Sequence, residues 1–569
     1  MNDIRRSILW VVFGLSMVLI WDKWQIHNGQ QPTFFPGSAT VAAPAAAPAP
    51  SVDASLPTAV AAPAGTATAN AVPGEAPAGA PSPVAARHEV TTDVFKLVFN
   101  TEGGSLIGAE LLKHAEATQQ SKDQSELPFT LLTQNADRIY VAQTGLIGGA
   151  FPTHKTPMTL LTPETALADG QNELQVRFES ADVGGVKLVK TYTLTRGRYD
   201  IAVKHEVQNL GTQAVSPQLY VQLVRDGSKL SSETPFYSTF TGPAVYTDEK
   251  KYQKVEFADI EKNKAEFTKT ASDGYVAMVQ HYFASAWVLD AGVVRDNFVR
   301  KVDNNLFAAG SITSLAAIEP GQTQTVQARL FVGPQEEKVL ETIAPGLELV
   351  KDYGWLTILA KPLYWLLDAL HGFIQNWGWS IVALVLLLKI AFDWLNAKAY
   401  ASMAKMKAVS PKITEMRERL KDKPQEMQVA MMKIYKEEKV NPMGGCFPIM
   451  IQIPVFIALY WVLLSSVEMR NAPWIGWVHD LSAPDPFFIL PVLMTLSTLL
   501  QTALNPAPPD PMQAKMMWIM PLMFSVMFFF FPAGLVLYWL TNNILSIAQQ
   551  WLINTRMGVP PQFNLPKFK

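Results

Sequence analysis

The last third of this 569-residue chain contains five long apolar runs, which constrain its fold more than any other feature of the sequence. They occupy residues 379–395, 447–467, 487–504, 518–531 and 535–553. Most are close to the roughly 20 residues that an α-helix needs to cross the hydrocarbon core of a bilayer. Water cannot satisfy backbone polar groups there, so such runs are expected to be helical. The sequence therefore predicts a transmembrane core of five helices over residues 377–555.

A further apolar segment lies near the N-terminus, at residues 7–21, directly after Arg5 and Arg6. Basic residues before an apolar segment place the N-terminus in the cytoplasm. We predict a transmembrane signal-anchor over residues 1–28, which brings the number of crossings to six. A cleaved signal peptide has the same polarity and remains an alternative, because Ala-x-Ala triplets follow from Val41 onward.

Loop charges predict the orientation of these crossings. Residues 397–445 carry eleven Lys or Arg against six acidic residues, whereas residues 468–486 carry one Arg against three acids. Basic loops stay in the cytoplasm, so residues 397–445 are expected to form a cytoplasmic helical hairpin. Both termini, including a short tail at 556–569, then lie in the cytoplasm. The region between the first two crossings lies on the opposite side of the membrane.

The region between the first two crossings contains three segments that differ in composition and residue pattern. Residues 29–88 are predicted to be a disordered linker, because 28 of the 46 residues from 41 to 86 are Ala or Pro. Residues 89–345 contain short runs in which apolar and polar side chains alternate, which predicts an all-β sandwich domain. Residues 346–376 are aromatic and apolar with scattered charges, as expected of an amphipathic helix in the membrane interface.

Composition excludes several classes of function. The net charge of −2 argues against nucleic acid as the main partner. A single cysteine, Cys446, excludes an intramolecular disulfide and a Cys-rich zinc site. The sequence contains no HExxH, Walker A or GxSxG motif. We therefore expect no catalytic residues, no metal and no cofactor, and predict that the protein is not an enzyme.

Lys389 is a charged residue inside the first of the five runs. A charge at this depth costs at least about 2.5–3.5 kcal/mol, so it should face a wet cavity or a partner. Alternatively, Lys389 and Asp393 reach the cytoplasmic interface together as a helical pair. Uncharged polar residues in the other runs could line a hydrophilic groove with Lys389, although each alone is typical of helix packing. They are Gln452, Thr495, Ser497, Thr498, Gln501, Ser525, Thr541, Asn542, Asn543 and Ser546.

Methionine is concentrated in the same region, with 16 of the 21 Met residues between 401 and 531. Met side chains are flexible and polarizable, so a Met-rich surface accepts many apolar shapes. Met494, Met516, Met517, Met520, Met523 and Met527 could form an adaptable surface for hydrophobic segments beside the phenylalanines of 528–531. Ordinary packing or lipid contact is the alternative for each of them.

Two segments carry a resemblance to a known family. Residues 441–460, NPMGGCFPIMIQIPVFIALY, and residues 531–539, FPAGLVLYW, closely resemble the YidC/Oxa family of membrane protein insertases. The layout of the whole chain is similar to the Gram-negative members, which have a large periplasmic domain. The resemblance implies a conserved core of five transmembrane helices, a periplasmic β-supersandwich and a location in the bacterial inner membrane. It also implies insertion and folding of membrane proteins through a groove open to cytoplasm and lipid.

The resemblance extends to individual residues and partners. It implies that Lys389 and Gln452 lie in the groove, and that Phe456, Met494 and Met527 contact substrate helices. Many relatives carry Arg at the position of Lys389, which is always charged, whereas a buried Lys can lose its proton. The implied partners are nascent membrane proteins, the Sec translocon (SecYEG and SecDF), a ribosome or targeting factor at the cytoplasmic hairpin, and the lipid bilayer.

Two other functions compete with this interpretation. A secondary transporter could use Lys389 and Asp393 as an intramembrane proton relay, although the spans contain no internal repeat of the kind such proteins show. A periplasmic sugar-binding or glycan-modifying domain, tethered by the spans, is the other alternative.

Overall fold

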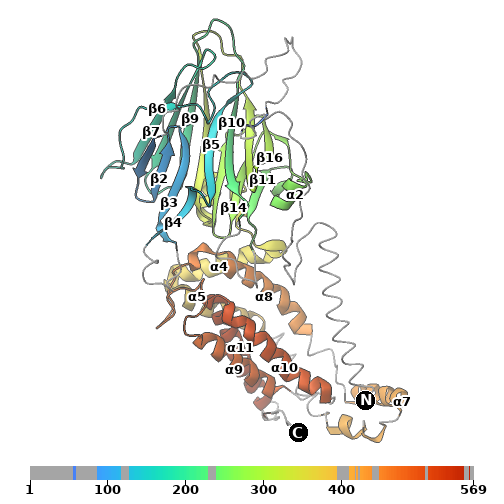
Figure 1. Ribbon diagram of the computed structural model, residues 1–569. Helices are drawn as coiled ribbons and strands as arrows, with labels where there is room; N and C mark the ends of the chain where they lie inside the picture. Colours follow the sequence, from blue (N-terminus) through green and yellow to red (C-terminus); the bar gives the residue numbers. More distant parts are fainter. Residues whose placement is uncertain are drawn as a thin grey trace. The chain divides into compact units, whose positions relative to one another are not determined.

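The computed structural model describes residues 56–58, 86–116, 127–228, 239–393, 397, 409, 411–416, 418–420, 423–438, 447–505, 511–556 and 563. These residues divide into a β unit that ends at Lys351 and a helical unit that begins at Asp352 (Figure 1). The predicted anchor at 1–28, much of the predicted linker and hairpin, and most of the tail lie outside the described residues.

The β unit is a sandwich of two nine-stranded sheets in which all the neighbouring strands pair antiparallel. The first sheet has the order β1 (Arg87–Thr91), β2 (Phe95–Asn100), β3 (Ser105–Ala115), β4 (Pro128–Gln134), β5 (Ile139–Ile147), β10 (Gln218–Asp226), β17 (Leu306–Ser314), β16 (Arg295–Asp303) and β13 (Thr270–Ala271). The second has the order β12 (Lys251–Lys254), β11 (Gly242–Thr247), β14 (Tyr275–Gln280), β15 (Phe283–Leu289), β18 (Thr323–Pro334), β9 (Asp200–Asn209), β8 (Val186–Thr195), β7 (Glu173–Ser180) and β6 (Met158–Leu160). The predicted all-β sandwich is therefore confirmed.

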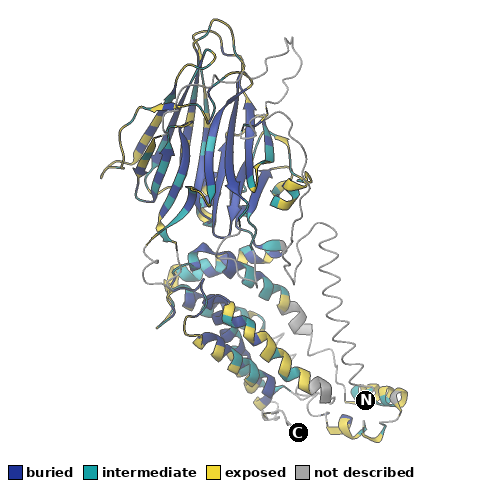
Figure 2. Cartoon of the chain, in the orientation of Figure 1, coloured by how far each residue is buried: buried dark blue, intermediate teal, exposed yellow. Residues whose placement is uncertain are grey.

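Burial differs between the edges and the centres of these sheets (Figure 2). Strand β7 alternates exposed and buried residues, as the sequence pattern predicts for a half-solvated strand. The central strands β10, β14 and β15 are buried on both faces. Other parts of the chain must therefore cover the outward-facing side chains of a central strand. The alternation of apolar and polar residues in the sequence does not predict this burial.

Lys190 on β8 ties the two sheets together through the core. Its Nζ donates hydrogen bonds of 2.6 Å to the carbonyl oxygens of Gly103 and Thr144, beside and within the first sheet. His205 Nε2 on β9 lies 3.0 Å from Thr144 Oγ1. Burial lowers the pKa of Lys190 to about 7. Burial, and then the nearby Lys190, lower the pKa of His205 to about 3.

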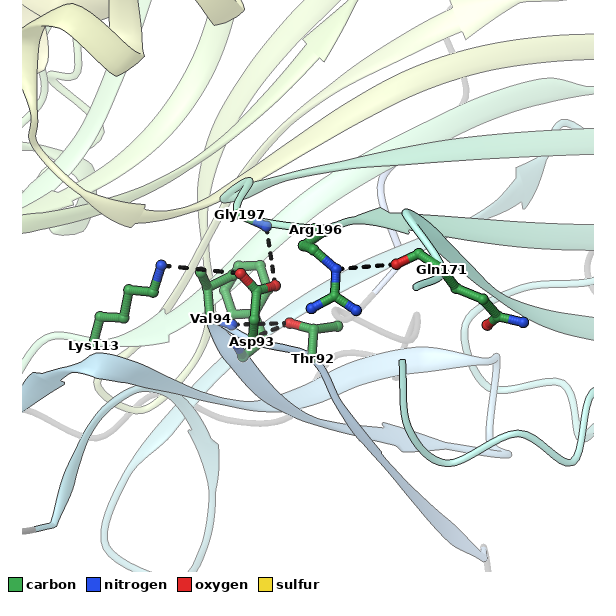
Figure 3. A network of polar contacts seen from close by, with 8 residues as sticks. Thr92, Asp93, Val94, Lys113, Gln171, Arg196 and Gly197 are labelled. Carbon is green, nitrogen blue, oxygen red and sulfur yellow. Dashed lines mark hydrogen bonds and ion pairs between the residues drawn. The ribbon is translucent and has the colours of Figure 1, made fainter. Parts of the chain in front are cut away.

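A polar network fixes the β8–β9 turn against the first sheet (Figure 3). Asp93 Oδ1 accepts a 3.0 Å hydrogen bond from the backbone N–H of Gly197, and Asp93 Oδ2 lies 3.9 Å from Lys113 Nζ. Arg196 Nε donates to the carbonyl oxygen of Gln171 at 3.0 Å. Gly197 has φ +74°, a left-handed conformation that glycine adopts without steric cost. Short helical turns complete the unit: α2 (Phe257–Glu261), α3 (Glu337–Ile343) and η1 (Leu347–Val350).

The helical unit contains the elements that the apolar runs predict. They are η2 (Gly354–Leu356), α4 (Thr357–Ile374), α5 (Trp377–Ala391), α7 (Pro424–Glu437), α8 (Phe447–Ser465), η3 (Val467–Met469), α9 (Ile489–Leu504), α10 (Pro511–Met527), η4 (Phe528–Phe530) and α11 (Ala533–Arg556). The five predicted spans correspond to α5, α8, α9, α10 and α11. In the part of the chain that the structure describes, no helix meets both the length and the hydropathy needed to cross a membrane.

The junction between α4 and α5 is fixed by capping. Gln375 ends α4 in a left-handed conformation with φ 58°, and its N–H donates to His371 O at 2.8 Å. Asn376 then caps α5, because its side chain accepts a 3.0 Å hydrogen bond from Trp379 N. Helix α4 exposes 89% of Ile358 and 89% of Phe373, which lie about 60° apart around the helix axis. The location of this helix in the membrane interface stays a prediction.

The two halves of the predicted hairpin at 397–445 pack through apolar side chains. Val409 and Ile413 are buried against a cluster from α7 and its neighbour: Met416, Met431, Ile434 and Tyr435. Lys412 Nζ also pairs with Glu438 Oε1 across the hairpin. In the described part of the hairpin, apolar side chains of the two halves therefore pack against one another.

Candidate functional site

Helix α11 carries a stripe of polar side chains and packs against both α5 and α9. At about 100° per residue, the residues of this stripe fall within one side of the helix. They are Asn542, Asn543, Ser546, Gln549, Gln550 and Asn554. The stripe covers more of the helix circumference than one neighbouring helix can contact. Its two edges can therefore form hydrogen bonds with two different helices.

The first edge of the stripe holds Lys389. Lys389 Nζ donates a 2.7 Å hydrogen bond to Ser546 Oγ. Ser546 Oγ in turn donates to the carbonyl oxygen of Asn542 at 2.6 Å. Since the hydroxyl proton is used within α11, both oxygen lone pairs of Ser546 remain available to an ammonium group. Lys389 is half-buried and Ser546 is buried, so this contact is shielded from water.

Asp393, one turn beyond Lys389, bonds separately to α11. Gln549 Nε2 donates a short hydrogen bond to Asp393 Oδ1. The pairing of Lys389 with Asp393 that one alternative requires is thus not what these side chains form. Gln549 is a site residue that the sequence analysis missed. The available signal was its spacing, three residues after Ser546, which places it on the same edge of the helix.

The second edge of the stripe faces α9. Asn543 Nδ2 donates to Ser497 Oγ at 3.1 Å and to Thr498 Oγ1 at 2.8 Å. Both hydroxyls donate onward to the carbonyl oxygen of Met494, at 2.7 and 2.9 Å. Further along, Gln550 Nε2 lies 3.2 Å from Asn505 Oδ1. Polar side chains therefore join α9 to α11 over two turns.

The three predicted substrate-contact residues share one apolar cluster. Phe456 on α8 lies 4.3 Å from the ring centroid of Trp539 on α11. Met527, at the end of α10, is partly buried against the same cluster, whereas Met494 is only 3% exposed. Phe456 and Met527 are accordingly better placed than Met494 to meet an external segment.

Helix α10 presents methionine outward. Met516 is 42% exposed, Met520 49% and Met523 63%, beside Phe524 at 49%. These side chains form an exposed Met-rich face, as the sequence indicates. That this face accepts hydrophobic substrate segments stays a prediction.

Three other predicted groove residues have different outcomes. Gln452 belongs to α8, but its side chain lies outside the described residues. Thr541 is buried and lies about 100° behind Asn542 on the helix, off the edge that bonds α5. Asn542 contributes its carbonyl oxygen to the contact with Ser546. Within the described ranges, no cluster of three or more His, Cys, Asp or Glu could hold a metal ion.

Comparison with known proteins assigns the family. Residues 87–366 match the family model described as the YidC periplasmic domain, and residues 369–559 match the one described as 60Kd inner membrane protein. A protein of Cupriavidus metallidurans named membrane protein insertase YidC is 54% identical over 560 residues, which is 98% of each chain. This chain belongs to the YidC family of membrane protein insertases.

Other relatives agree. A YidC insertase of Cupriavidus pinatubonensis is 56% identical over 561 residues, and one of Burkholderia cenocepacia is 53% identical over 563. Both matches cover 98% of this chain. A solved structure described as an active YidC insertase is 19% identical and covers 81% of this chain and 91% of its own, with a TM-score of 0.36. The family models and the curated relatives confirm the family predicted from residues 441–460 and 531–539, and the transporter alternative finds no support in these relatives.

Proposed function

We propose that this YidC-family chain is a membrane protein insertase and chaperone, which inserts integral inner-membrane proteins and helps them fold. It would act alone or with the Sec translocon, without a cofactor, through a hydrophilic groove open to the cytoplasm and to lipid. The proposal rests on one observation. Ser546 accepts a 2.7 Å hydrogen bond from the half-buried amine of Lys389, and the polar stripe of α11 to which Ser546 belongs bonds to both α5 and α9.

The proposed path uses both surfaces of the helical unit. The polar leading part of a substrate would meet Lys389 and the amides of α11, where it loses less hydration than in lipid. Its apolar segment would move along the Met-rich face of α10 and the aromatic cluster around Phe456. Release into lipid is favourable by about 25 cal/mol per Å² of apolar surface buried. The membrane potential would favour outward movement of acidic segments.

The topology and partners belong to the same proposal. Six transmembrane helices, five of them forming the core, would place both termini in the cytoplasm and the β sandwich in the periplasm. The substrates would be nascent membrane proteins in the lipid bilayer. The basic hairpin at 397–445 suits an acidic ribosome or targeting-factor surface. SecYEG and SecDF are the proposed partners in the translocon.

Photo-crosslinking tests the path directly. A photoreactive amino acid at Phe456 or Met527 should crosslink to a stalled nascent single-span protein. Thr323, exposed on β18, provides a matched probe position in the β unit. Crosslinks from Thr323 but none from Phe456 or Met527 would contradict the proposed path.

A further inference from the structure

The Ala/Pro-rich linker contains a single leucine between residues 41 and 86, namely Leu56, and Pro57 follows it. Residues 56–58 are described, and they lie against the first sheet of the β unit. A leucine among Ala, Pro and small polar residues is the largest aliphatic side chain that this linker can offer for burial.

The receiving surface is the outer face of the first sheet. On β5, Thr144 points into the sandwich, because it contacts Lys190 and His205 of the second sheet. Side chains alternate along a strand, so Ile147 on the same strand points outward. Tyr220 on β10 pairs with Gly145 on β5 and with Ile312 on β17, which places these positions on the same outer face.

Leu56 packs onto an apolar cluster on this face. The cluster consists of Ile147, Tyr220 and Ile312, which are 6%, 0% and 4% exposed, with Phe298 at its edge. An antiparallel sheet with a solvated face normally keeps that face polar. Here the outer face is apolar and needs cover, and Leu56 supplies part of it. Pro57 is itself buried.

A charged side chain fixes the backbone of the same segment. Arg300 Nη1 on β16 donates a 2.6 Å hydrogen bond to the carbonyl oxygen of Leu56. The Arg300 guanidinium lies 5.5 Å from the ring centroid of Phe298, so the ring that borders the apolar cluster also orients the donor. The partly buried Leu56, the buried Pro57 and a charge-assisted backbone hydrogen bond together hold the Leu-Pro segment in one position.

We propose that this outer face is a docking site for an extended Leu-Pro segment, and that its occupant is Leu56 and Pro57 of the same chain. The docked segment divides the predicted linker, residues 29–88, so that only residues 29–55 of it separate the N-terminal segment from the docking site. The docking site thus shortens the tether to the N-terminal segment. This role is independent of insertion activity.

Pulsed electron paramagnetic resonance on the full-length protein tests the proposal. The native cysteine is removed by Cys446→Ser, and spin labels are attached through Thr58→Cys and Asn304→Cys, both at exposed positions of the β unit. We expect a single narrow distance distribution. Leu56→Asp, and separately Arg300→Ala, should broaden it severalfold. Val72→Asp makes the same kind of change elsewhere in the linker and should leave the distribution narrow.

Two outcomes would overturn the proposal. One is a broad distribution in the parent protein that Leu56→Asp does not change. The other is a narrow distance between two chains, each carrying one of the labels, because the occupant would then be a second copy. Circular dichroism of Arg300→Ala would verify that its sandwich remains folded, and Leu56→Asp lies outside the sandwich strands.

Discussion

Lys389 on α5 donates a 2.7 Å hydrogen bond to Ser546 on α11, although 157 residues separate them in the sequence. Its neighbour Asp393, one helical turn away, bonds to Gln549 instead. The amine is thus oriented by a different helix and not by the acid on its own helix. In the part of the chain that the structure describes, the hydrogen bond of this amine goes to a hydroxyl and not to a carboxylate.

Replacement of the amine should affect acidic substrates most. We expect Lys389→Ala to slow insertion of proteins with acidic translocated segments roughly tenfold, since a charge-assisted hydrogen bond is worth about 1.5–3 kcal/mol. Neutral segments should be affected less. Insertion rates in proteoliposomes measure both, with Lys389→Arg as the charge-preserving control. An equal loss for acidic and neutral segments would refute the electrostatic role.

Ser546 should act through Lys389. Ser546→Ala removes the acceptor of the 2.7 Å bond, so we expect the same preference against acidic substrates as in Lys389→Ala, at about half the size in free energy. Ser546→Thr should retain activity, because it keeps the hydroxyl. Ser380→Ala is a matched control, since Ser380 Oγ donates to the carbonyl oxygen of Asn376, the N-cap of its own helix. The idea fails if Ser546→Ala and Ser380→Ala have the same insertion rates.

Asn543 should contribute to stability. Asn543→Ala removes hydrogen bonds to Ser497 and Thr498. Interhelical hydrogen bonds in membrane proteins average about 0.6 kcal/mol, with a maximum near 1.7. We therefore expect a loss of about 1 kcal/mol in the free energy of unfolding, measured by denaturation in detergent. No loss would mean that the two hydroxyls, which also bond to Met494 O, are satisfied without the amide.

Lys190 should make the β unit more stable at alkaline pH. Its pKa is about 7 in the folded protein and 10.5 when unfolded, so the unfolded chain binds more protons between these values. Stability should therefore rise with pH across that window, by up to about 1.4 kcal/mol per pH unit. Hydrogen exchange of β8 and β9 in the whole protein, corrected for intrinsic rates, measures this slope. Lys190→Met should abolish the slope; an unchanged slope would assign it to other groups.

His205 should make the stability of the β unit depend on pH in the acidic range as well. Its pKa of about 3 in the folded protein lies below the usual 6.5, so the unfolded chain again binds more protons between these values. Stability should fall as the pH drops from about 6.5 to about 3. His205→Gln should reduce this loss while leaving the alkaline slope of Lys190 in place. The same hydrogen-exchange experiment, extended to acidic pH, distinguishes the contribution of His205 from that of Lys190.

The sequence by itself determined the local elements. Apolar runs set α5 and α8 to α11, and alternation set the β sandwich, because both depend on the period of neighbouring side chains. Family-specific segments at 441–460 and 531–539 also sufficed to predict the family. Lys389 was recognisable because a charge inside an apolar run is costly wherever the run lies.

Only the tertiary structure decided which side chains meet. The choice of Ser546 over Asp393 for Lys389, the approach of Asn543 to Ser497 and Thr498, and the docking of Leu56 beneath Arg300 all join residues far apart in the chain. Burial on both faces of β10 likewise arises from its central place in the sheet. Such contacts depend on how helices and sheets pack against one another, and hydrophobic periodicity carries no information about that choice of partner.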